Sequence, residues 1–234
     1  MSYRNSYKCS EHTPKKGGGC SNVARFFCDC LRVNLQILTR PIAYLGDNEQ
    51  DEYINGHVKK ILDVYQYLTH FAQQFSIDEQ QHSIIVMFVD AFDTVFQRNE
   101  SYILQRFLEL KNKPNMQHKV IWQVERECSP GHPRNIDRSI YCDANTTAYP
   151  PQPANSDARW LNAGGYIGYL YDVLANFRQF IDFIEVTGGH DAKGEWRGDQ
   201  EIISMHFINR SEHMTLDYYS YLMQAMNKMY GVMR

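Results

Sequence analysis

The hydrophobic and polar positions of this chain change their spacing several times, and each spacing predicts a helix or a strand. Apolar residues recur every three to four positions from His57 to about Phe75, which predicts a helix. Ile84–Val89 is apolar throughout, as is typical of a strand covered on both faces. The same reasoning predicts further helices over residues 23–31, 102–110, 172–186 and 199–209, and further strands over residues 33–38, 120–124 and 161–171.

This alternation of strands and helices predicts an α/β fold, a sandwich in which helices flank a mostly parallel sheet. The length suits one domain over residues 22–234, and residues 1–21 are expected to be a flexible lead-in or a clipped first strand. Loops are expected over residues 47–56 and 188–198. Residues 127–160 form a longer irregular stretch, and irregular segments of that length are often functional.

Composition favours a folded domain and argues against two classes of partner. The chain of 234 residues is 43% hydrophobic and 13% aromatic, which is enough apolar surface for a sizeable core. Its net charge is −3 and it has no long basic run, which argues against nucleic acid as the main partner. No apolar stretch reaches about 18 residues, so no membrane span is expected in this chain.

The cysteines and glycosylation sequons bear on the compartment. One or two disulfides in an oxidising compartment, a zinc site around Cys28-Asp-Cys30, and buried thiols all remain open. Asn-x-Ser/Thr sequons permit a secretory location, although the first residues lack the apolar core of a signal peptide. The cysteines are Cys9, Cys20, Cys28, Cys30, Cys128 and Cys142, and the sequons start at Asn99, Asn145 and Asn209.

Two carboxylates, Asp90 and Asp93, follow the apolar run at residues 84–89. Ligands of open α/β sheets bind at the carboxyl ends of strands, and Mg²⁺ and Mn²⁺ take carboxylates together with substrate phosphates. The pair therefore predicts a site for a divalent ion bound to a nucleotide diphosphate. Alternatively, Asp90 caps a turn and Asp93 begins a helix. A haloacid dehalogenase phosphatase is disfavoured, because its Asp-x-Asp-x-Thr motif needs the second Asp one position earlier.

Two later segments offer polar groups or space for a ligand. Gly164 and Gly165 interrupt a strand pattern, which indicates close approach by a ligand or by another part of the backbone. Asn162 could offer its amide to a sugar hydroxyl. Asp199, followed by Gln200, is expected to cap a helix, to bind sugar hydroxyls, or to activate an acceptor hydroxyl as a base.

Together and in this order, these segments resemble the glycosyltransferase domain of the procollagen lysyl hydroxylases over roughly residues 22–225. The family's Arg-Phe-Leu-Asn-Ser-Gly-Gly-Phe-Ile-Gly run is matched by residues 159–168 with conservative changes. Other family motifs are an Asp-x-x-Asp after a strand, an Asp-Gln at a helix start, a Leu-Asp before a late Gln, and an Ala-Glu-x-x-Cys-Trp-Pro segment. They are matched in turn by Asp90 and Asp93, by Asp199 and Gln200, by Leu216, Asp217 and Gln224, and by Glu125, Cys128 and Pro130.

The resemblance implies a GT-A-like nucleotide-sugar fold and a metal-dependent transferase. Such an enzyme would use Mn²⁺ to move a hexose from a UDP-sugar to a hydroxylysine-type acceptor of collagen-like polypeptides, in the endoplasmic reticulum lumen. In the roles it implies, Asp90 and Asp93 hold the metal and Asp199 is the catalytic residue. The substrate-binding residues would be Asn162, Gly164, Gly165, Gln200 and Lys59.

Several positions depart from the family pattern. The family lysine two residues after a glycine is Val58 here, with Lys59 and Lys60 next, and the family Trp before Pro130 is Ser129. The expected metal-ligating His beyond the last helix and the apolar first strand have no counterpart, so both ends look incomplete. These departures favour an alternative, a degenerate domain that binds collagen-like or glycan partners without turnover. A transferase with a non-collagen acceptor is a third interpretation.

Overall fold

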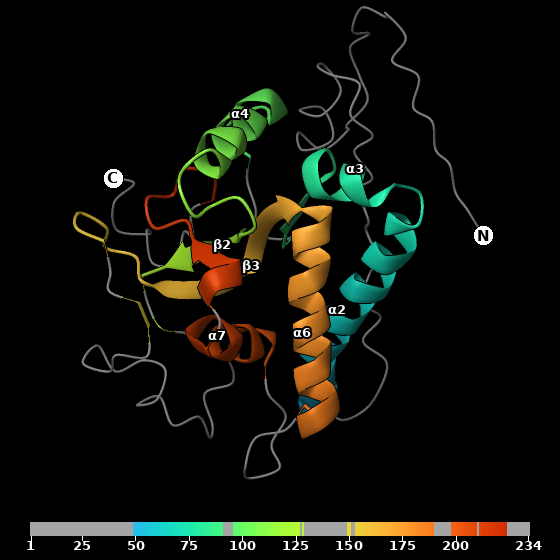
Figure 1. Cartoon of the computed structure of the whole chain (residues 1–234). Coiled ribbons are helices and arrows are strands. Elements are labelled where there is room, and N and C mark those ends of the chain that lie inside the picture. Colours follow the sequence, from blue (N-terminus) through green and yellow to red (C-terminus); the bar gives the residue numbers. More distant parts are fainter. Residues whose placement is uncertain are drawn as a thin grey trace, which may run out of the picture.

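The computed structural model describes residues 49–90, 96–126, 128, 149–150, 153–189, 198–209 and 211–223. The predicted helix at 23–31 and strand at 33–38 lie outside these residues, as do Asp93, Ser129, Pro130 and Gln224. The described elements form one sheet with helices on both faces (Figure 1), which confirms the predicted α/β class.

The sheet of the described residues has four strands in the order β1-β3-β2-β4. Strand β3 is antiparallel to both β1 and β2, and β4 is parallel to β2. The sheet is therefore mixed here rather than mostly parallel as predicted, because an apolar run reports burial and carries no information on strand direction. The strands are β1 (Ile85–Val89), β2 (Val120–Glu125), β3 (Trp160–Tyr169) and β4 (Met214–Leu216).

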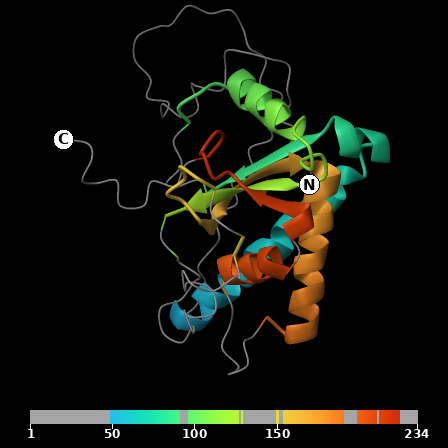
Figure 2. The same cartoon turned by 60° about the vertical axis from the view of Figure 1, so that its left-hand side comes forward.

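Helices cover the two faces of the sheet unequally. Helices α2, α6 and α7 lie on one face and α4 lies on the other (Figures 1 and 2). The short helix α3 packs near α6, and no described helix is long and apolar enough to cross a membrane. The bounds are α2 (Glu49–Ala72), α3 (Ile77–His82), α4 (Glu100–Lys111), α6 (Leu170–Thr187), α7 (Asp199–Asn209) and a 3₁₀ turn, η1 (Ser211–His213).

Alternating side chains of the central strands build both cores. Trp122 faces α6, where its ring packs 6.0 Å from that of Phe180, while the neighbouring Ile121 joins Phe107 of α4 on the other face. Successive residues of a strand point to opposite faces, so the apolar residues 120–122 of β2 serve both cores. All four of these side chains are almost completely buried.

Most described elements match the sequence predictions, with three exceptions. The predicted loop at 47–56 is wrong, because α2 already begins at Glu49 and runs through Gly56. Neither α3 nor β4 was predicted. Helix α3 carried a readable signal, since Ser76 and Glu79 form a reciprocal capping box at its start. Strand β4 has only three residues, and its pairing with β2 depends on tertiary contacts.

A bulge in β3 prepares the place where polar groups gather. Trp122 lies opposite Tyr166, but Gln123 lies opposite Asn162, so residues 163–165 are extra in β3 relative to β2. On its other side β3 stays in register with β1, where Val89 lies opposite Gly165. Bulges of this kind re-aim side chains and often occur next to functional sites.

Candidate functional site

Asp90 lies directly after β1, beside the bulge of β3. Its backbone N–H donates to the carbonyl oxygen of Gly164 at 2.8 Å, which continues the β1–β3 pairing by one residue. Its carboxylate side chain is 46% exposed. The predicted acidic end of the apolar strand is thus held in place by backbone pairing and is open to solvent.

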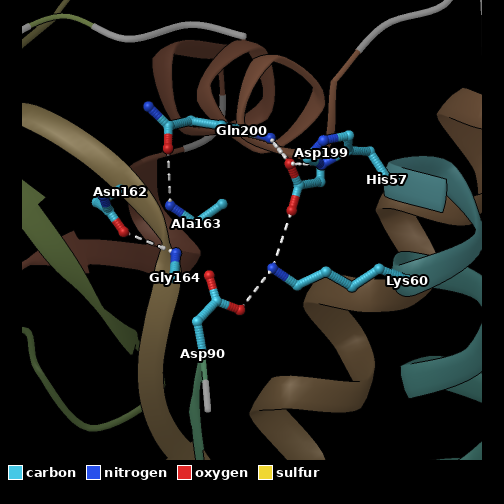
Figure 3. A network of polar contacts seen from close by, with 8 residues as sticks. All are labelled: His57, Lys60, Asp90, Asn162, Ala163, Gly164, Asp199 and Gln200. Atoms are coloured by element: carbon cyan, nitrogen blue, oxygen red, sulfur yellow. Dashed lines mark hydrogen bonds and ion pairs between the residues drawn. The ribbon is translucent and has the colours of Figure 1, made fainter. Parts of the chain in front are cut away.

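Lys60 of α2 joins Asp90 to Asp199, the first residue of α7 (Figure 3). Its Nζ lies 3.0 Å from Oδ1 of Asp90 and 3.1 Å from Oδ2 of Asp199, and 5.1 Å from the ring centroid of Phe88. Burial alone would lower the pKa of Lys60, but the negative charges of Asp199 and Asp90 outweigh that effect and raise it. Lys60 is therefore an ammonium ion at neutral pH.

Asp199 is buried, with a side chain only 8% exposed, and each of its oxygens is engaged. Oδ1 accepts from the backbone N–H of Gln200 and contacts Nδ1 of His57, both at 2.8 Å, while Oδ2 meets Lys60. Burial would raise the pKa of Asp199, but the hydrogen bond with His57 and the charge of Lys60 lower it to about 2. Such a carboxylate accepts hydrogen bonds well and is a weak base at neutral pH.

Glu125 connects Gln200 with the bulge of β3. Oε1 of Glu125 accepts from Nε2 of Gln200 at 2.7 Å, and its Oε2 accepts from Nδ2 of Asn162 at 3.1 Å. Oε1 of Gln200 in turn accepts from the backbone N–H of Ala163 at 3.2 Å, and Oδ1 of Asn162 accepts from that of Gly164 at 2.7 Å. These bonds stabilise the bulge from inside the protein. The side-chain amides of Asn162 and Gln200 each use one donor and one acceptor in them.

The two glycines of the bulge have different surroundings. A Cβ on Gly164 would lie 2.7 Å from Oδ1 of Asn162 and 3.0 Å from Oδ2 of Asp90. The absence of a side chain at Gly164 therefore lets these two oxygens keep their positions. A Cβ on Gly165 would meet Sδ of Met223 at 3.0 Å and Oε1 of Gln123 at 3.1 Å. Packing within the chain thus explains Gly165, whereas Gly164 keeps space beside the exposed carboxylate.

The structure brings Asp90, Asn162, Gly164, Asp199 and Gln200 together, but Lys59 lies elsewhere. The Lys59 ammonium points outward on α2 and lies 2.6 Å from Asp63. Sequence reasoning missed the roles of its neighbour Lys60, of His57 and of Glu125. Residues three apart share a helix face, so the spacing of His57 and Lys60 could have indicated that both meet one partner.

For a divalent cation, the described residues of the network offer one exposed carboxylate, that of Asp90. Among the described residues there is no group of three or more His, Cys, Asp or Glu side chains that could hold a metal ion. The exposed carboxylate of Asp90 is nevertheless an oxygen ligand of the kind that Mg²⁺ and Mn²⁺ prefer, and its Oδ2 stands over the space that Gly164 leaves. Asp93, the second predicted ligand, lies outside the described residues.

Comparison with known protein families supplies an independent finding. A family model described as the PLOD GT domain matches residues 34–233, which include every residue of the polar network. The chain belongs to this family. Membership in a glycosyltransferase family agrees with the α/β fold and implies a sugar donor and an acceptor. No curated protein matches the chain in the corresponding search.

Residues of the family motifs lie close together in the polar network. Asp90 directly follows β1, Asn162 and Gly164 lie at the bulge of β3, and Asp199 and Gln200 begin α7. Five residues from three separate elements thus converge on one place (Figure 3). These five residues, which belong to motifs that carried the resemblance, therefore meet in space, although the first and the last of them are more than a hundred positions apart along the chain.

Proposed function

We propose that this chain is a metal-dependent glycosyltransferase that moves a hexose from a UDP-sugar to a hydroxylysine-type acceptor of a collagen-like polypeptide. The observation that carries the proposal is the bridge Asp90–Lys60–Asp199, in a chain of a glycosyltransferase family. It joins a solvent-facing carboxylate, open to a diphosphate-bound cation, to a buried carboxylate that stays ionised. Charge of both signs is thereby organised before any ligand arrives, as transfer of a charged leaving group requires.

In this proposal, one set of residues binds the diphosphate of the donor and another set borders its sugar. Asp90, with Asp93, would hold Mn²⁺ or another divalent ion, which would neutralise the charge that develops on the departing diphosphate. Asn162, Gly164 and Gln200 would border the transferred sugar, and Gly165 would keep the bulge compact behind them. Support for these assignments comes from the hydrogen bonds by which Asn162 and Gln200 hold the backbone of the bulge in place.

Asp199 would face the sugar hydroxyls or the acceptor hydroxyl. His57, the Gln200 N–H and Lys60 fix the orientation of its carboxylate, so a hydroxyl donating to it would be positioned without reorganisation. We propose for Asp199 a catalytic role through hydrogen bonding to the reacting groups.

A location in the secretory pathway, in the endoplasmic reticulum lumen, is part of the proposal. Cys128 is disulfide-bonded, and disulfides persist in oxidising compartments. The other five cysteines lie outside the described residues. Modification of a collagen-like polypeptide within that compartment agrees with this chemistry.

One observation favours a second function, a binding module without turnover. The ammonium of Lys60 already contacts the carboxylates of Asp90 and Asp199 and balances one of their two negative charges, so this part of the site is partly compensated without an added ion. A domain of this kind would hold a collagen-like or glycan partner and would bind UDP without a metal, or not at all.

Calorimetric titration of UDP with and without Mn²⁺ separates the two functions. The enzyme predicts Mn²⁺-dependent binding that weakens at least about 100-fold in Asp90→Ala, since a phosphate-bound ion loses a charged ligand. Asp78→Ala is the matched control, because its carboxylate side chain is 87% exposed on α3 and should leave UDP binding unchanged.

Turnover is then measured as UDP released from a panel of UDP-hexoses, with and without a hydroxylysine-containing collagen peptide. Acceptor-stimulated release supports the proposed transferase. Binding of UDP that ignores Mn²⁺, together with no release from any donor, would establish the binding module instead. If other acceptors stimulate UDP release and the collagen peptide does not, the proposed acceptor is wrong.

A further inference from the structure

Lys60 lies between two carboxylates of very different exposure. The side chain of Asp90 is 46% exposed, that of Lys60 is 23% exposed and that of Asp199 is 8% exposed. An ion pair that reaches solvent is screened and weak, whereas the charge of a buried pair cannot be removed without leaving its partner uncompensated. The contact with Asp90 is therefore the exchangeable one, and the contact with Asp199 is the persistent one.

The position of the ammonium relative to β1 limits how a cation can approach Asp90. Lys60 lies over the ring of Phe88, two residues before Asp90 and thus on the same face of the strand. Its Nζ contacts Oδ1 of Asp90 directly. A second cation that takes this oxygen meets an ammonium already there, and like charges at such a distance repel.

We propose that Lys60 is a positioning residue that competes with a divalent cation for Asp90 and remains bound to Asp199 when the cation arrives. The inference deepens the proposed function and rests on it for the identity of the cation. Competition of this kind weakens the affinity of Asp90 for a free ion, because an ion that takes Oδ1 must displace the ammonium. It also links the two carboxylates, since a cation at Asp90 leaves the ammonium to Asp199 alone.

The test measures Mn²⁺ affinity by calorimetry and by the electron paramagnetic resonance signal of free Mn²⁺, without any donor. Lys60→Met is expected to bind Mn²⁺ at least about tenfold more tightly than the native chain, because two carboxylates lose their shared counter-ion. Lys60→Arg keeps the positive charge and should return the affinity to near the native value.

Lys59→Met is the matched control for net charge. Lys59 is the preceding residue of the same helix and its ammonium lies on Asp63, so its loss changes total charge equally without touching Asp90. Its Mn²⁺ affinity should equal that of the native chain. Adding Asp90→Asn to Lys60→Met should abolish the gain, which locates the ion at Asp90.

Three results would overturn the inference: equal or weaker Mn²⁺ binding in Lys60→Met, an equal gain in Lys59→Met, or no Mn²⁺ binding in either chain. If Lys60→Met does not fold, a crystal structure of the native chain with Mn²⁺ decides. The expected result is an ion on Asp90 with Nζ of Lys60 on Asp199 alone. An ion on Asp90 with Nζ still at hydrogen-bonding distance from that carboxylate overturns competition.

Failure of this inference is distinguishable from failure of the proposed function. A native chain that shows the predicted exchange at Asp90 but releases no UDP from any UDP-hexose contradicts the transferase and leaves the competition standing. A chain that turns over UDP-sugar, with Mn²⁺ affinity unchanged by Lys60→Met, contradicts the competition alone.

Discussion

Two partly or fully buried lysines, Lys60 and Lys111, lie at opposite ends of the β1–β3 pair. Lys60 packs over Phe88 near the end of β1, whereas Lys111 packs over Tyr169, which lies opposite Ile85 at the start of β1. Lys60 meets two carboxylates at 3.0 and 3.1 Å. Lys111 meets one carboxylate, that of Asp172 at 3.4 Å, and donates to the carbonyl oxygen of Lys119 at 2.9 Å.

Because their partners differ, the pKa values of the two lysines shift in opposite directions from the ordinary value. Burial lowers the pKa of Lys111, and the single charge of Asp172 does not overcome it. At Lys60, two carboxylates overcome burial and raise the pKa. The pair around Lys111 is closed, with both side chains less than a tenth exposed, and ties the end of α4 to the start of α6. The group around Lys60 is exposed to solvent at Asp90. Lys111 thus joins two helices within the fold, whereas Lys60 holds two carboxylates of the candidate site together.

The largest expected effect is on stability, from Lys111→Met. Asp172 would remain buried without its counter-charge, which costs about 3–5 kcal/mol of the free energy of unfolding. Urea denaturation followed by circular dichroism measures it. Lys111→Met combined with Asp172→Leu should regain most of that loss, because no buried charge is then left alone. A loss below about 1 kcal/mol in the single variant would contradict the structural role of Lys111.

Asp199→Asn should reduce turnover of UDP-sugar about 100-fold, since a fixed charged acceptor at the reacting groups is replaced by a neutral amide. The loss in unfolding free energy should be smaller than that of Lys111→Met. Steady-state rates of UDP release, at equal amounts of folded protein, provide the measurement. Asp63→Asn, on the outer face of α2, is the control, and turnover within threefold of native in Asp199→Asn would refute the assigned role.

The low pKa of Asp199 predicts how stability depends on acid. Its pKa in the folded protein is about 2, below the ordinary value of 3.8, so the folded state binds this proton less readily than the unfolded state. The stabilisation, about 2 kcal/mol, is complete above about pH 4 and is lost as the pH falls through 2. Urea unfolding between pH 5 and pH 2 should show a shallower loss for Asp199→Asn, and parallel curves would show that the pKa is ordinary.

Gly164→Ala and Gly168→Ala should separate site from core with a smaller effect. The new methyl at Gly164 would press on Asn162 and Asp90, so Mn²⁺-dependent UDP affinity should fall about tenfold with little change in stability. At Gly168 it would lie 3.0 Å from Cγ2 of Val173 and 3.2 Å from Cγ2 of Val120, which should cost about 1–3 kcal/mol of stability. Calorimetry and urea denaturation of both variants give the comparison, and the opposite pattern would contradict it.

Lys59→Met should have the smallest effect of all. Its contact with Asp63 is solvent-exposed, and exposed ion pairs contribute about 0.5 kcal/mol or less. Melting temperature, UDP affinity and turnover should all stay near the native values. A loss of UDP affinity comparable to that of Asp90→Ala would return Lys59 to the donor site.

Local patterns predicted much of the architecture and several residues that the structure brings together in the polar network. The continuous apolar run predicted β1 and set Asp90 at its end, because a charge that interrupts such a run marks the limit of burial. The Asp-Gln pair predicted the start of α7 at Asp199. The choice between Lys59 and Lys60 could not be made in this way, since the side chains of adjacent helical residues point about 100° apart and the partner of each depends on where α7 lies.

The sequence by itself determined most of the described helices and strands, because burial imposes spacing on apolar residues and these spacings differ between the two. It also determined the family, through short motifs retained in order. Only the tertiary structure decided that β3 runs antiparallel between β1 and β2, that its bulge makes room for Asp90, and that one ammonium serves Asp90 and Asp199. Strand direction and the convergence of distant side chains depend on contacts between elements, and the spacing of residues within one element carries no record of them.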